Sequence, residues 1–153
     1  MSLEKSKQGG YIAAAFGSLI GSITLGALGV YLGTNYTKFF MPNAGLEGLL
    51  PVLLGVFLGW WIGEVMGCYL ALRWLHYCKP KQTAKLLTVL TSLGIFLWLF
   101  ISPIISNLFK GDLSDIQFSQ IDNKIRMITA SLTSISLALL ARYLTCAREL
   151  NQD

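Results

Sequence analysis

The sequence predicts an all-α fold, an integral membrane four-helix bundle in which two glycine-rich helices form a tight antiparallel hairpin. Of the 153 residues, 54% are hydrophobic and only 13% are charged, and the mean hydropathy is +0.58. This composition is too apolar for an ordinary soluble domain. Four apolar stretches are each long enough to cross roughly 30 Å of hydrocarbon as a helix. In the first two stretches glycines recur on a four-residue row, interrupted in the first stretch only by Leu25, a glycine zipper typical of closely packed membrane helices.

The predicted spans cover about residues 11–33, 49–72, 84–109 and 125–146 of a single transmembrane domain, 1–153. The connections are too short to hold a second folded domain. The first span follows Lys5 and Lys7, as a signal peptide would, but its apolar run is longer than the apolar region of a signal peptide. We therefore expect an uncleaved membrane span.

The first two spans carry small residues along one helical row each. These glycines are Gly17, Gly21, Gly29 and Gly33 in the first span and Gly55, Gly59, Gly63 and Gly67 in the second. Apolar side chains gain little by leaving lipid, so membrane helices associate through the close contact that small residues permit. We expect these rows to pack the two spans against each other. Alternatively, one row contacts a second copy of the chain or a partner subunit.

The third and fourth spans differ in their side chains. The third is bulky almost all round, which is typical of a helix with broad lipid exposure. In the fourth, Ala130, Ser134 and Ala138 form a small row that ends at Arg142, and this row directs Arg142 into the bundle. Between these spans, residues 112–121 are predicted to form a short outer interfacial helix, with Asp112 positioned to cap its first turn.

Glu64 lies among the glycines of the second span, about four residues from the middle of that span. An ionised residue at the centre of a membrane helix costs about 2.5 to 3.5 kcal/mol on insertion scales, so Glu64 needs a compensating contact. The first interpretation is an intramembrane charge pair between Glu64 and Arg142, which lies at a similar depth. In the second, Glu64 is protonated and donates a hydrogen bond to Ser or Thr of the fourth span. In the third, it faces water in a transport pathway.

The positive charges are distributed unevenly between the two ends of the spans. With four crossings, eight of the 12 Lys and Arg residues fall on the side of the termini and four on the other side. The positive-inside rule then predicts that both termini are cytoplasmic, in a bacterial inner membrane or a thylakoid. We expect the basic side to meet the headgroups of the lipid bilayer rather than nucleic acid.

The sequence contains no pattern typical of an enzyme. The only histidine, His76, lies in a connection, and no zinc-protease motif or paired cysteine motif is present, so we expect no catalytic residue, metal or cofactor. We expect an accessory, assembly or structural component of a membrane complex, either a homo-oligomer or a subunit, acting through glycine-lined helix faces. The alternative is an oligomeric small-solute or proton-linked transporter or channel that uses Glu64.

Overall fold

The computed structural model describes residues 10–42, 45–108 and 115–150, and these residues form four long helices. The helices are α1 (Tyr11–Phe40), α2 (Leu49–Trp74), α3 (Pro80–Leu108) and α4 (Asp115–Leu150), with a short 3-10 turn, η1 (Leu46–Gly48), before α2. The described residues contain no strand, so the predicted all-α four-helix fold is confirmed. Each helix includes a segment that is long and apolar enough to cross a membrane, which makes the chain a polytopic membrane protein.

Local sequence explains where the helices begin. Gly10 precedes α1 with a φ of 95°, a left-handed conformation that glycine adopts without a steric penalty. Pro80 is the first residue of α3, where the missing N–H is harmless and the fixed φ suits a helix. α1 continues past the predicted end at residue 33 to Phe40, and its 30 residues are about 45 Å long.

The predicted interfacial helix over residues 112–121 differs from the structure. Residues 115–121 are the first turns of α4 and run into the fourth span without a break. No Gly or Pro stands between residues 115 and 125, so nothing in the local sequence ends the helix there. Residues 112–114, including the expected cap Asp112, lie outside the described residues.

The glycine rows of α1 and α2 lie against each other. A methyl group added at Gly21 would overlap the carbonyl oxygen of Gly63, and one added at Gly29 would overlap that of Gly55. The same is true across the whole contact, which joins Gly17 to Gly67, Gly21 to Gly63, Leu25 to Gly59, Gly29 to Gly55 and Gly33 to Pro51. The two numbers in each pair add up to the same value, so the helices run antiparallel in one fixed register. All eight glycines of the predicted rows therefore lie between α1 and α2.

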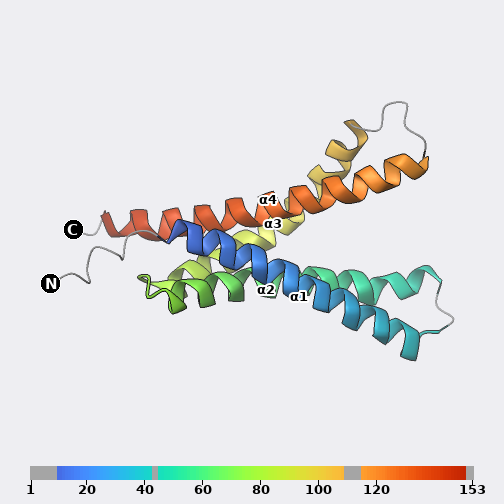
Figure 1. Cartoon of the computed structure of the whole chain (residues 1–153), viewed down its shortest axis with the longest axis horizontal. Coiled ribbons are helices and arrows are strands. Elements are labelled where there is room, and N and C mark those ends of the chain that lie inside the picture. The colour runs from blue at the N-terminus through green and yellow to red at the C-terminus, as the bar shows by residue number, and fades with distance from the viewer. Residues whose placement is uncertain (1–9, 43–44, 109–114, 151–153) are drawn as a thin grey trace.

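The four helices form two antiparallel pairs, α1 with α2 and α3 with α4, which diverge from each other along their length (Figure 1). We call one end the turn end, where α1 begins, residues 75–79 connect α2 to α3, and α4 ends. At the opposite end, which we call the open end, the α1–α2 pair and the α3–α4 pair are well separated (Figure 1). Contacts of α1 with α4 and of α2 with α3 join the pairs nearer the turn end.

Candidate functional site

The buried face of α2 presents one carboxylate to the other helices. Trp60, Glu64, Cys68 and Leu72 are buried and follow one another at four-residue spacing, so they form a single stripe along α2. Glu64 has no exposed surface at all, although it is one of the few charged residues in any of the spans. The stripe points Glu64 toward the contact between the two helix pairs.

Side chains of α2 and α4 form a hydrogen-bonded chain around this carboxyl group. The indole Nε1 of Trp60 donates to Ser134 Oγ at 2.7 Å, and Ser134 Oγ donates to Glu64 Oε2 at 3.2 Å. Ser18 of α1 is also fully buried and lies beside this site, with its hydroxyl 3.5 Å from the backbone carbonyl oxygen of Ser134. The small residues at positions 18 and 134 allow α1 and α4 to approach closely enough for this contact.

Two buried oxygen atoms at this site make no hydrogen bond with the described residues. They are Glu64 Oε1 and Thr91 Oγ1, and both side chains have no exposed surface. Thr91 lies on α3 beside the Glu64 carboxyl group, without the geometry of a hydrogen bond. A buried polar atom that lacks a partner costs about 1 to 3 kcal/mol. All four helices thus contribute a polar residue to one region, and part of its hydrogen-bonding capacity is unused by the described residues.

Aromatic side chains surround the network on the side of the open end. The rings of Trp60 and Trp98 meet edge to face with centroids 5.4 Å apart, and Phe57 contacts Trp98 at 6.5 Å. Trp98 Nε1 donates to Thr129 Oγ1 at 3.1 Å, so this indole also has a polar partner. The rings fill space between α2 and α3 beside the carboxyl group.

Arg142 lies in a different environment, and the structure does not bring it to Glu64. Its guanidinium group donates to the carbonyl oxygen of Cys78 at 2.7 Å and lies 3.4 Å from Thr83 Oγ1, at the turn end. Ser134, the partner of Glu64, is eight residues before Arg142, which is about 12 Å along α4. Arg142 is buried, as expected of its position on the small row. It contacts the α2–α3 turn instead of Glu64.

The physical reason for this difference is the length of α4. The predicted fourth span placed Arg142 at the depth of Glu64 by counting from the middle of residues 125–146. The helix begins at Asp115 instead and ends at Leu150. Its midpoint therefore lies near residues 132 and 133, which brings Ser134 to the level of the carboxyl group.

The α2–α3 turn that Arg142 contacts has an unusual backbone. His76 and Lys79 have φ values of 56° and 49°, in the left-handed region that side chains other than glycine rarely adopt. The guanidinium group also lies over the ring of Tyr77, 6.0 Å from its centroid. A buried cation from α4 thus fixes a strained connection between two other helices.

The described residues give no grouping that would hold a metal ion. No three His, Cys, Asp or Glu side chains come together within the described part of the chain. Cys68, Cys78 and Cys146 are not joined in disulfides.

Comparison of the chain with protein-family models, with curated proteins and with solved structures gave no match.

The sequence predicted Glu64 as the central residue, with Arg142 or a hydroxyl group of the fourth span as alternative partners. It did not predict the contributions of Thr91 and Trp98. Thr91 is buried on the face of α3 that includes Thr83, Leu87 and Gly94, a row at spacings of three and four residues. Small and polar residues on one row of an otherwise bulky helix indicate the side of α3 that faces the bundle. This pattern could have predicted that Thr91 is buried at the site.

Proposed function

We propose that the protein is a structural or assembly component of a membrane complex, without enzymatic activity, and that a partner helix packs against the middle of α1, at Gly26. The observation that supports this proposal is the environment of Gly26. Ser18, Ser22 and Gly26 form a small row on α1, and the first two are buried. A methyl group added at Gly26 would meet no atom within 4 Å.

The divergence of the helix pairs explains why the row is only partly covered. α4 packs on α1 near Ser18, whose hydroxyl faces the carbonyl oxygen of Ser134, and the pairs separate toward the open end (Figure 1). Exposed apolar side chains say little in a membrane, since lipid covers them equally well. An uncovered small residue is more informative, because it offers close backbone approach that lipid tails do not need.

The glycine-lined faces themselves are a poorer surface for a partner. The eight glycines of the predicted rows lie between α1 and α2, where their backbones contact each other. The partner helix in this proposal therefore uses the second small row of α1, at Gly26.

The test is purification of the protein from its native membrane in a mild detergent. Gly26→Leu should abolish the co-purification of a partner protein or of a second copy of the chain. The helical content and thermal stability of the isolated chain should be unchanged. Gly45→Leu is the matched control, because Gly45 also has open space around it but lies before η1. Retention of the partner by Gly26→Leu, or its equal loss in Gly45→Leu, would count against this function.

A second candidate function is proton-linked transport, favoured by the two buried oxygens without partners, Glu64 Oε1 and Thr91 Oγ1. A carboxyl group inside the membrane is a common component of proton relays. Proton flux into proteoliposomes should then be lost in Glu64→Gln and retained in Glu47→Gln, whose carboxylate is exposed in η1. Equal flux in protein-free liposomes and in wild-type proteoliposomes would exclude this function.

For orientation, we propose that the turn end faces the cytoplasm, because most of the Lys and Arg residues in the described part of the chain lie toward that end. Labelling of Cys78, which is partly exposed in the turn, with a membrane-impermeant maleimide tests this in intact cells. Cys78 should be labelled only after the membrane is permeabilised.

A further inference from the structure

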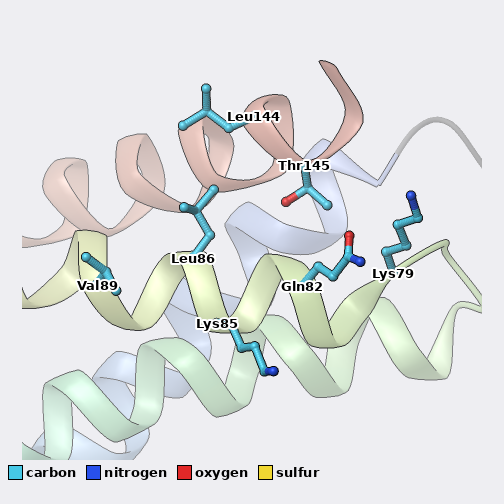
Figure 2. Close-up of a pocket in the computed structure, with 7 residues that line it drawn as sticks. All are labelled: Lys79, Gln82, Lys85, Leu86, Val89, Leu144 and Thr145. Carbon is cyan, nitrogen blue, oxygen red and sulfur yellow. The ribbon is translucent and has the colours of Figure 1, made fainter. Parts of the chain in front are cut away.

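We propose that the turn end of the α3–α4 pair binds an anionic phospholipid, with the phosphate at Lys79 and Gln82, Lys85 as a further cation at the edge of the pocket, and the acyl chains along Leu86, Val89 and Leu144. These side chains, with Thr145, line a pocket of about 450 Å³ between α3 and α4 (Figure 2). The inference is independent of the proposed function, since it concerns the turn end of the molecule and a different pair of helices.

The pocket has a polar part and an apolar part, arranged along the direction in which the helices cross the membrane. Lys79 is the last residue of the α2–α3 connection and Gln82 lies in the first turn of α3, and Val89 lies seven residues beyond Gln82, about 10 Å deeper along the helix. Val89 and Leu144 are exposed, with 59% and 42% of their surfaces accessible. A phospholipid has the same arrangement of polar and apolar groups, with a charged phosphate at the membrane surface and apolar acyl chains below it.

The polar groups suit a phosphate with an additional hydroxyl group nearby. Figure 2 shows the Gln82 side chain pointing toward Thr145, Lys79 beyond it at the turn, and Lys85 extending on the side of α3 away from α4. The Gln82 amide and the lysine ammonium groups are donors, and phosphate oxygens are acceptors. The Thr145 hydroxyl already donates to the carbonyl oxygen of Ala141 at 2.7 Å, so its oxygen is left to accept from a headgroup hydroxyl.

The charge around the turn favours an anion over a zwitterion. A second hollow of about 520 Å³ adjoins the first, shares Lys79 and Gln82 with it, and adds Arg73 and Lys81. No carboxylate is among the described residues that line either hollow. Lys79 also has another interaction within the chain, so the argument rests equally on Lys85, Gln82 and the neighbouring cations.

Membrane surface electrostatics sets the expected size of the effect. A Lys or Arg near an anionic surface contributes an attraction equivalent to about a five-fold change in binding. Removal of the two pocket lysines together should therefore weaken anionic lipid binding by about 25-fold. Phosphatidylglycerol carries the phosphate and the free hydroxyls that the pocket suits, so it is the probe we choose.

The experiment is native mass spectrometry of the detergent-solubilised full chain, titrated with phosphatidylglycerol or with phosphatidylcholine. The wild-type chain should retain phosphatidylglycerol preferentially, and Lys79→Gln/Lys85→Gln should lose that preference. The charge-preserving Lys79→Arg/Lys85→Arg should keep it, and so should the control Lys38→Gln/Lys124→Gln, which removes two cations near the open end. Inorganic phosphate or glycerol phosphate at the lipid concentration should not displace the bound lipid.

Four results would overturn the proposal. They are equal retention of the two lipids by the wild-type chain, unchanged preference in the glutamine double variant, the same loss in the Lys38→Gln/Lys124→Gln control, and displacement by soluble phosphate. The last result would assign the pocket to a free phosphate. If the glutamine variant fails to fold, Leu144→Asn provides the second test, because it leaves the cations in place and should still weaken binding through the acyl chains.

Discussion

Adding one methyl group should have opposite effects on stability at two glycines, Gly63 and Gly26. At Gly63 a new Cβ would overlap the carbonyl oxygen of Gly21 and would lie 2.7 Å from the carbonyl carbon of Gly21 and 3.0 Å from Leu25 Cβ. Most of these atoms belong to backbone, which cannot rotate away, so α1 and α2 must move apart. At Gly26 no atom lies within 4 Å of the added methyl group.

The magnitudes follow from two opposing contributions. Alanine is favoured over glycine in a helix interior by about 0.5 to 1 kcal/mol, and both variants receive this gain. Overpacking a tight contact costs about 1 to 3 kcal/mol, and only Gly63→Ala incurs this cost. Gly63→Ala should therefore be less stable than wild type by up to about 2.5 kcal/mol, and Gly26→Ala more stable by about 0.5 to 1 kcal/mol.

Reversible unfolding in mixed micelles, monitored by circular dichroism, measures both free energies of unfolding. Gly59→Ala serves as a second test of the same contact, because its Cβ would overlap the carbonyl oxygen of Leu25. The reasoning is refuted if Gly63→Ala is as stable as wild type, or if Gly26→Ala is destabilised to the same extent as Gly63→Ala.

Three further substitutions test the polar contacts and the turn. Ser134→Ala removes the hydroxyl between Trp60 and Glu64, and should lower the free energy of unfolding by about 1 to 3 kcal/mol. Denaturant titration measures this loss, and a smaller value would mean that the hydrogen-bonded network does not stabilise the fold. Arg142→Met keeps the length of the side chain but loses the charged hydrogen bond to the Cys78 carbonyl, so proteolysis at the α2–α3 turn should be faster than in wild type. His76→Gly should raise the melting temperature, with a gain of about 1 kcal/mol, because glycine adopts the positive φ without strain.

The sequence predicted the helical architecture well because its signals are local and periodic. Length and apolarity alone define four crossings, and the four-residue spacing of Gly55, Gly59, Gly63 and Gly67 places these residues on one face. The antiparallel direction of α1 and α2 follows from the short connection between them. Nothing in the residues between 115 and 125 distinguished a separate interfacial helix from an extension of α4.

The details of the site depend on quantities that the sequence does not contain. The partner of Glu64 was limited to a cation or a hydroxyl on the fourth span, but the choice between Arg142 and Ser134 required the point at which α4 begins. The openness at Gly26 depends on the angle between the two helix pairs, which no spacing encodes. Thr91 was overlooked because bulky neighbours dominate α3 in the sequence.

The central claim, that a partner helix packs beside Gly26, is tested most directly by photo-crosslinking in the native membrane. A photoreactive residue at Val30, one turn beyond Gly26 and 41% exposed, should yield a discrete adduct with one protein. The same residue at Leu28, which lies on the other side of α1 and lines a groove between α1 and α2, should give lipid adducts only. Lipid adducts alone from both positions would contradict the account.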